Sequence, residues 1–220
     1  MSYYKYDNSY MLDMMEQHPG VFGGVAIVDE SKADVCTTMQ ALAKKGVRGF
    51  RIYTSAEQAA AWGDGMHRMW SCAADHGLAM CLLADPAALP AVATMCAKHP
   101  KTTVVIDHFA RIGMKGDINE GDVDRLCRLA DFSQVHVKTS AFYALGKKQA
   151  PYTDMGPLIH RLRDTYGANR LMWASDCPFQ VEGGHTYADS IALIRDRLDF
   201  LSAQDKAWML RKTAEKVFFS

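Results

Sequence analysis

Hydrophobic positions along the chain follow two alternating patterns, which predict six strand-and-helix units behind one opening helix. Short apolar runs bounded by turn residues indicate buried strands. We expect strands at Gly23 to Val28, Val47 to Tyr53, Leu78 to Leu83, Thr102 to Asp107, Val135 to Thr139 and Leu171 to Ser175. Between the strands, apolar residues spaced three or four apart, such as Val123, Leu126, Cys127 and Ala130, are typical of helices with one buried face.

The regular alternation of strands and helices predicts a parallel sheet with helical crossovers. The opening helix, from about Asn8 to Gln17, stops at a Pro-Gly pair. Two architectures fit, an open doubly wound sheet and a (β/α) barrel, yet AIVDESKAD at the end of the first strand contains no glycine for a phosphate-binding loop. Six units also fall short of the eight in a complete barrel. We therefore predict an α/β, TIM-barrel-like parallel sheet that is incomplete at its beginning.

The composition indicates one globular domain that acts on a small molecule. No low-complexity linker or composition shift divides the 220 residues, so we expect a single domain over residues 1–220. Lys plus Arg equal Asp plus Glu at 25 each, so the chain has no net positive charge that would attract nucleic acid or an anionic membrane. A small-molecule substrate is therefore the expected partner.

The chain start and the cysteines indicate a cytoplasmic protein. The first residues have no basic-then-apolar signal layout, and no apolar run reaches membrane-spanning length. The cysteines, at positions 36, 72, 81, 96, 127 and 177, form no Cys-x-x-Cys pair, and several fall on apolar faces of predicted elements. We therefore expect all of them to be reduced thiols, as in cytosolic proteins.

Charged side chains gather at the predicted strand ends, where both candidate folds bind ligands. The alternation of side chains along a strand puts Arg51 and Tyr53 on one side of the second strand. By the same alternation, Lys138 points into the barrel when the neighbouring valines pack on the helices. His108 directly follows the fourth strand, and Asp176 follows the last. We expect Arg51, His108, Lys138 and Asp176 to converge on one pocket.

Three of these strand ends carry motifs that resemble a known enzyme family. The stretches VVIDHFAR, VHVKTSAFY and NRLMWASDCPF look like motifs of the amidohydrolase-related family of metal-dependent TIM-barrel hydrolases, in its lactonase and pyrone-dicarboxylate hydrolase branch. DNSYMLDMMEQHPGVFGGVAIVD, KKGVRGFRIY and LRKTAEKVFF resemble further segments of that family. The resemblance implies His108 as a histidine at a middle strand tip, Asp176 as the acid after the last strand, and Arg51 as an arginine that grips a substrate carboxylate or lactone oxygen.

The chain departs from this family at its beginning, and the departure bears on metal binding. The family begins with a His-x-His pair on its first strand, and this sequence has no such pair. The resemblance therefore implies that two strands and a helix are absent. His108 and Asp176 are the visible ligands for a divalent metal such as zinc, whereas a catalytic zinc usually takes three protein ligands. The expected metal site is incomplete, and the open strand edges favour association into a homo-oligomer.

Each candidate residue also has a purely structural explanation. Asp176 would cap the turn that follows it. Lys138 would pair with a buried acid as a packing device, and Arg51 would form a helix-to-sheet ion pair. Asp107 is expected to face away from the histidine after it, and either to orient that histidine or to cap a loop. His136 is interpreted as structural.

The leading functional hypothesis is hydrolysis of a lactone or a related small carboxylated cyclic compound. Asp176 would take a proton from water and later return it to the leaving group. The water would attack a carbonyl polarised by His108, by a metal or by both, while Arg51, Lys138 and Tyr53 bind the substrate. Decarboxylation in the same family and a non-catalytic remnant or binding module are the alternative interpretations, and nothing in the sequence separates them.

Overall fold

The sheet matches the predicted strands closely. The computed structural model describes residues 4–219, so residues 1–3 and 220 of the predicted domain lie outside the described residues. Its six strands are parallel and lie in chain order. They are β1 (Gly24–Ala26), β2 (Val47–Thr54), β3 (Ala79–Ala84), β4 (Thr103–Ile106), β5 (Val135–Ser140) and β6 (Leu171–Ala174). Every predicted strand is confirmed, with ends that differ by two residues or fewer.

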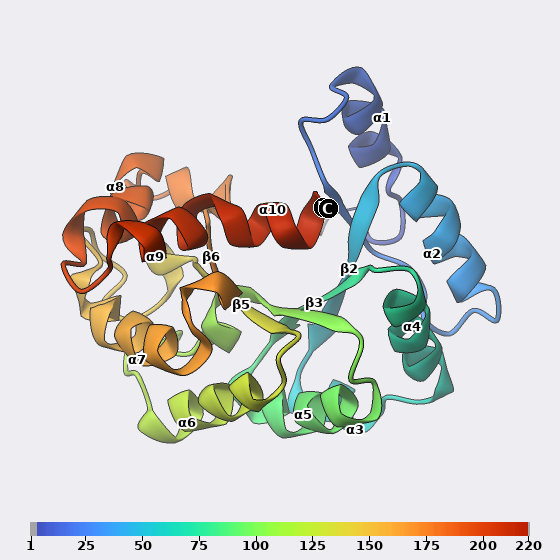
Figure 1. Ribbon diagram of the computed structural model, residues 1–220, viewed down its shortest axis with the longest axis horizontal. Helices are drawn as coiled ribbons and strands as arrows, with labels where there is room; N and C mark the ends of the chain where they lie inside the picture. The colour runs from blue at the N-terminus through green and yellow to red at the C-terminus, as the bar shows by residue number, and fades with distance from the viewer. Residues whose placement is uncertain (1–3, 220) are drawn as a thin grey trace.

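Helices cover the outer face of a curled sheet, which forms part of a barrel (Figure 1). The helices of the described residues are α1 (Ser9–Gln17), α2 (Val35–Lys44), α3 (Ala56–Ala60), α4 (Asp64–Asp75), α5 (Leu89–Lys98), α6 (Glu120–Arg128), α7 (Gly156–Tyr166), α8 (Tyr187–Ala192), α9 (Ala203–Ala207) and α10 (Thr213–Phe218). The main core lies between the sheet and these helices, and includes Phe50, Met80, Val104 and Val137 from strands and Trp70 and Ile159 from helices. Within the described residues, no helix is long and apolar enough to cross a membrane.

The C-terminal helix α10 covers part of the inner face of the sheet. Strands β1 and β6 are the two edges of the sheet, as expected for an incomplete barrel. A second, smaller apolar cluster on the inner face joins Ala79, Cys81, Val105 and Met172 to Val217 and Phe218 of α10. At the edge, a Cβ on Gly23 would meet the carbonyl oxygen of Phe218 at 2.8 Å. The end of α10 therefore packs tightly against the start of β1, in a position that favours glycine.

The expectation that all cysteines are reduced is wrong for one pair. Cys36 in α2 and Cys72 in α4 form a disulfide, with 5.7 Å between their Cα atoms. Cys81, Cys96 and Cys127 are buried free thiols, and Cys177 is an exposed one. The sequence could not indicate the pair, because only the packing of α2 on α4 brings together cysteines that lie 36 residues apart.

His136 is a buried histidine of β5, consistent with a structural role. Its side chain is 5% exposed, and its Nδ1 lies 3.0 Å from the carbonyl oxygen of Gln134. Burial is the largest influence on its pKa, which falls from the usual 6.5 to about 4. The folded protein therefore keeps this imidazole neutral in weak acid, where the unfolded chain becomes protonated.

This difference predicts a loss of stability on acidification. As the pH falls from 6.5 toward 4, the unfolded state binds a proton that the folded state does not, so the free energy of unfolding decreases. Once the pH is below the pKa of both states, His136 has lowered the free energy of unfolding by roughly 3 kcal/mol. We expect His136→Gln to flatten the decline, as measured by urea unfolding across this pH range. The exposed His18 provides the control variant His18→Gln. If the free energy of unfolding declined equally in the wild type and in His136→Gln, His136 would not be the group responsible for the loss.

Candidate active site

The loops after β4, β5 and β6 begin with left-handed backbone at residues other than glycine. After β4, four consecutive residues from His108 to Arg111 have φ values of 51°, 52°, 53° and 62°. Ala141 after β5 and Asp176 after β6 have φ values of 59° and 56°. Such conformations cost on the order of 1–3 kcal/mol each and concentrate at functional sites. These turns aim the side chains of neighbouring strand ends at one region.

A buried charge cluster lies beneath this region, on the inner face of the sheet. The Asp107 carboxylate has no exposed surface and accepts contacts from Arg51 Nη2 at 3.0 Å and Lys138 Nζ at 2.8 Å. Burial would raise the pKa of Asp107, but the two cations outweigh burial and lower it. Burial would likewise lower the pKa of Lys138, but Asp107 raises it overall. Asp107 and Lys138 are therefore both charged near neutral pH.

The position of Asp107 corrects the sequence-based interpretation. Asp107 does not face away from the site to serve a neighbouring loop, because it is the shared counter-ion of two cations from β2 and β5. Strand alternation already contained the signal: Asp107 has the parity of Val105, which packs on the inner face. His108 reaches the same side because its left-handed backbone breaks that alternation.

His108 and Asp176 lie next to each other at the mouth of the site. His108 Nε2 is 3.5 Å from Asp176 Oδ1, and His108 Nδ1 is hydrogen-bonded to Ser140 Oγ at 2.8 Å. The Tyr143 hydroxyl donates to Asp176 Oδ2 at 2.8 Å. The Asp176 carboxylate thus faces a histidine and a tyrosine across the strand ends. This arrangement differs from that of a helix cap, where a carboxylate accepts from the backbone N–H groups of the following turn.

Burial and charge set the protonation states around Asp176. Burial, followed by the positive charges of Lys138 and Arg51, lowers the pKa of His108 more than the carboxylates of Asp107 and Asp176 raise it. His108 is therefore a neutral imidazole at neutral pH. Burial and the hydrogen bond to Asp176 raise the pKa of Tyr143, so its hydroxyl keeps its proton and remains a donor.

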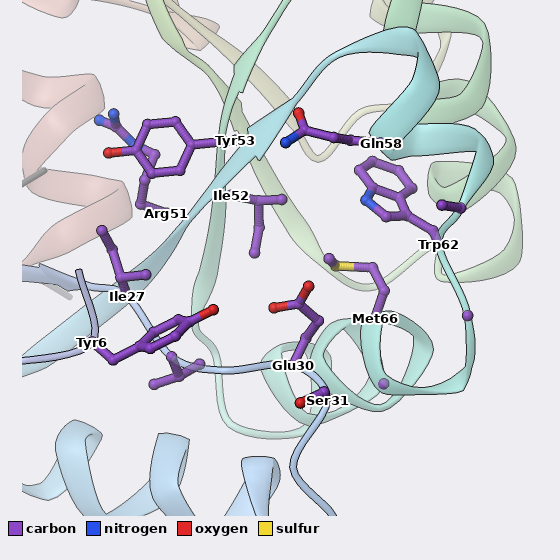
Figure 2. Close-up of a pocket in the computed structure, with 14 residues that line it drawn as sticks. Tyr6, Ile27, Glu30, Ser31, Arg51, Ile52, Tyr53, Gln58, Trp62 and Met66 are labelled. Atoms are coloured by element: carbon purple, nitrogen blue, oxygen red, sulfur yellow. The ribbon is translucent and has the colours of Figure 1, made fainter.

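A cavity of about 500 Å³ adjoins the charge cluster through Arg51. Figure 2 shows Arg51 and Tyr53 side by side on β2, with Tyr6, Glu30 and Trp62 lining other parts of the cavity. Tyr53 is 39% exposed. Because Arg51 both lines the cavity and contacts Asp107, a ligand in the cavity would lie next to the buried charges.

The structure brings together the side chains that the strand pattern selected. Arg51 and Lys138 meet at Asp107, while His108 contacts Asp176 at the ends of β4 and β6. Tyr53 lines the cavity beside Arg51. Sequence reasoning missed Tyr143, although VHVKTSAFY places it just after a strand end, where parallel sheets carry functional groups.

The described residues do not supply a full ligand set for a catalytic metal at this site. His108 Nε2 and Asp176 Oδ1 are adjacent donors, but a catalytic zinc usually takes three protein ligands. Across residues 4–219, the group of three or more His, Cys, Asp or Glu side chains close enough to hold one ion is Cys36, Cys72 and His76, which lies elsewhere. The expected ligands His108 and Asp176 are therefore together, but their set is incomplete.

Comparison with known proteins identifies the family. A family model described as Amidohydrolase matches residues 1–219. The chain belongs to the amidohydrolase family. An L-fucono-1,5-lactonase from Burkholderia ambifaria is 27% identical over 182 residues, covering 81% of this chain and 63% of that relative. The chain thus spans less than two thirds of the length of the curated relatives that it matches.

Solved amidohydrolase structures share the fold. A probable 2-pyrone-4,6-dicarboxylic acid hydrolase from Acinetobacter baumannii, with citric acid bound, has a TM-score of 0.84 and 21% identity, covering 100% of this chain and 81% of that one. A zinc-bound amidohydrolase from Burkholderia multivorans has a TM-score of 0.77 and 18% identity, covering 96% of this chain and 78% of that one. The sheet is accordingly part of an amidohydrolase barrel.

Proposed function

We propose that this amidohydrolase hydrolyses a small lactone that carries a carboxylate. The observation that carries the proposal is the contact of Asp176 with His108 and Tyr143, beside cations held at Asp107. A base next to fixed positive charge suits water attack on an ester carbonyl whose substrate is anionic. The similarity to a lactonase supports lactone hydrolysis, and the similarity to a probable pyrone-dicarboxylic acid hydrolase supports a substrate with carboxylates.

Asp176 would act as the general base. Its Oδ2 already accepts the Tyr143 hydroxyl, so Oδ1, which faces His108, is the oxygen free to receive a proton from water. The deprotonated water attacks the lactone carbonyl carbon, and the C–O bond of the ring then breaks. The protonated Asp176 returns its proton to the leaving alkoxide, so the carboxylate is regenerated.

His108 would polarise the carbonyl as a neutral donor. With Ser140 donating its hydroxyl proton to Nδ1, the imidazole carries its own proton on Nε2, toward Asp176 and the substrate. That N–H would stabilise the oxygen that becomes negative during attack. His108 and Asp176 would be two of the three protein ligands that a catalytic zinc usually takes, and a metal held there would also polarise the carbonyl.

Arg51 and Tyr53 would hold the substrate carboxylate from the cavity side. Arg51 is partly exposed at 22% of its side chain, and its guanidinium has donors beyond the Nη2 that contacts Asp107. Lys138 is less exposed, at 16%, and adds positive potential through its contact with Asp107. The substrate carboxylate would fix the position of the ring carbonyl relative to Asp176.

A substrate panel tests this proposal. We expect the protein to release one proton per molecule of a carboxylated lactone or a carboxylated pyrone opened, as followed in a weakly buffered indicator assay with and without added zinc. A neutral lactone of the same ring size is the control, and its kcat/KM is expected to be lower because Arg51 has no carboxylate to bind. Release of CO₂ from aromatic acids, without lactone opening, would replace the proposal with decarboxylation. No turnover of any substrate would favour a non-catalytic protein.

A further inference from the structure

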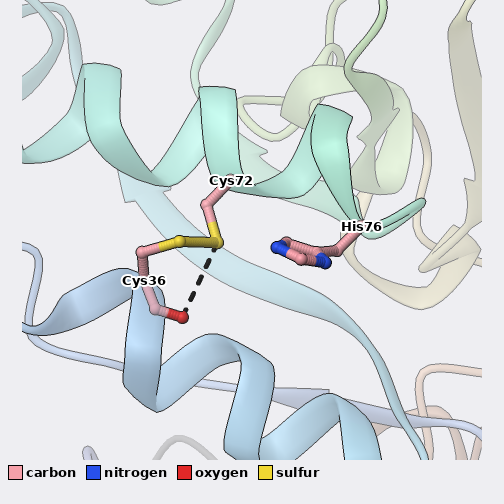
Figure 3. A group of neighbouring side chains, drawn as sticks. All are labelled: Cys36, Cys72 and His76. Carbon is pink, nitrogen blue, oxygen red and sulfur yellow. Dashed lines mark hydrogen bonds between the residues drawn. A yellow bond between two sulfur atoms is a disulfide. The ribbon is translucent and has the colours of Figure 1, made fainter.

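A second cluster of potential metal ligands lies between helices α2 and α4, away from the candidate active site. Cys36 belongs to α2, Cys72 to α4, and His76 directly follows α4. One ligand atom from each of the three lies within 4.8 Å of the others. Figure 3 shows the His76 imidazole beside the two sulfur atoms, in the space between the helices. The cluster is thus built from two elements that the fold already packs together.

Helix geometry explains why these side chains meet. Cys72 and His76 are four residues apart at the end of α4, so they project from the same face one turn apart. Cys36 and Gln40 have the same spacing on α2. The two faces oppose each other, which places Gln40 Nε2 at 3.5 Å from Cys36 Sγ and 2.9 Å from His76 Nε2. The sulfur and nitrogen atoms therefore lie around one small space, and the Gln40 amide contacts both Cys36 Sγ and His76 Nε2 there.

This donor set is that of a zinc site. Thiolate sulfur and imidazole nitrogen are the ligands that zinc prefers, and two cysteines with one histidine leave a fourth position for water or an amide oxygen. A cavity of about 480 Å³ lined by Gln40 and His76, among others, lies next to the cluster and gives an ion a route of entry. Zinc requires sulfur atoms about 3.8 Å apart, as follows from Zn–S bonds of about 2.3 Å in a tetrahedron. Opening the disulfide would supply that separation.

We propose that Cys36, Cys72 and His76 form a zinc site that is available only when the Cys36–Cys72 disulfide is reduced. A dithiol reductant breaks the S–S bond, delivering two electrons and two protons to give two thiols, and is itself oxidised to a disulfide. Zinc binding then displaces both thiol protons, and the His76 imidazole contributes a nitrogen lone pair. Exchange with an oxidised disulfide, such as the oxidised form of that reductant, reverses the sequence: the incoming disulfide takes up two electrons and two protons to give two thiols, the Cys36–Cys72 bond re-forms, and the ion is released. The same sulfur pair therefore links α2 to α4 in either state.

Cobalt(II) provides the test, because thiolate ligands give it a charge-transfer absorption in the near ultraviolet. All proteins carry Cys177→Ser, so that this exposed thiol beside Asp176 contributes nothing. We expect the form reduced with a phosphine to bind one cobalt ion per chain with this absorption, and zinc to displace it. The oxidised form is expected to show no such absorption. His76→Gln, which leaves both cysteines in place, is expected to lower the zinc affinity at least about 10-fold. Cys72→Ser is expected to lower it at least about 100-fold.

Several results would overturn this site. They are thiolate absorption of equal size in the oxidised protein, unchanged affinity in Cys72→Ser, and loss of the folded state when the wild type is reduced, as followed by circular dichroism. If Cys72→Ser does not fold, His76→Gln decides the matter, because it retains the disulfide. An affinity of His76→Gln equal to that of the parent would then exclude a site that includes His76.

Discussion

Asp176→Asn is expected to lower kcat for lactone hydrolysis by about 100-fold to 10,000-fold, the usual contribution of a general base. Asparagine fills the same volume and can still accept the Tyr143 hydrogen bond, but its amide cannot take a proton from water. KM is expected to change little, since in the proposed function Arg51 and Tyr53, not Asp176, hold the substrate carboxylate. Steady-state kinetics on a carboxylated lactone would measure both constants.

The exposed Asp164 supplies the matched control for that substitution. It pairs with His160 at the protein surface, so Asp164→Asn removes a carboxylate without touching the site. Its kcat is expected to equal that of the wild type. Near-normal turnover in Asp176→Asn, with circular dichroism unchanged, would reduce Asp176 to a structural role at the end of β6.

Asp107→Asn is expected to reduce the free energy of unfolding by about 3–5 kcal/mol, the range seen when one partner of a buried ion pair is removed. The carboxylate is fully buried and balances both Arg51 and Lys138. An amide in its place leaves two adjacent buried cations without a counter-ion. Urea unfolding at neutral pH would measure the loss.

A second substitution separates charge from shape in this prediction. Adding Lys138→Met to Asp107→Asn removes one of the unpaired cations, so the double variant is expected to regain part of the lost stability. Asp196→Asn, at the exposed pair with Arg195, should leave the unfolding midpoint unchanged. If Asp107→Asn lowered the free energy of unfolding by less than about 1 kcal/mol, Asp107 would not be the counter-ion that Arg51 and Lys138 require.

The strands could be predicted well because turn residues and helical patterns bound them, and because β3 and β4 are short apolar runs with nearly every residue buried. Periodicity also placed Arg51, Tyr53 and Lys138 on the inner side, since regular strand backbone obeys a period of two. His108 escaped that rule, because its positive φ turns it to the side that Asp107 already occupies. The pattern of residues cannot show where a chain leaves regular backbone, so strand alternation indicates the side on which Asp107 lies but not the side on which His108 lies.

For a related reason, the sequence could not predict contacts between distant segments. The Cys36–Cys72 pair depends on how α2 packs against α4, and Tyr143 reaches Asp176 from 33 residues away. The role of α10 is similar: LRKTAEKVFF resembles a segment of the family, but the sequence does not show that Val217 and Phe218 pack on the inner face of the sheet.

A crystal structure of Asp176→Asn with an uncleaved carboxylated lactone would test the proposed function most directly. The variant should bind substrate without turning it over, so the complex can be trapped. We predict the lactone carbonyl beside residue 176 and within hydrogen-bond distance of His108 Nε2, with the substrate carboxylate on Arg51. A lactone bound elsewhere, or bound with its carbonyl pointing away from His108 and residue 176, would contradict hydrolysis at this site.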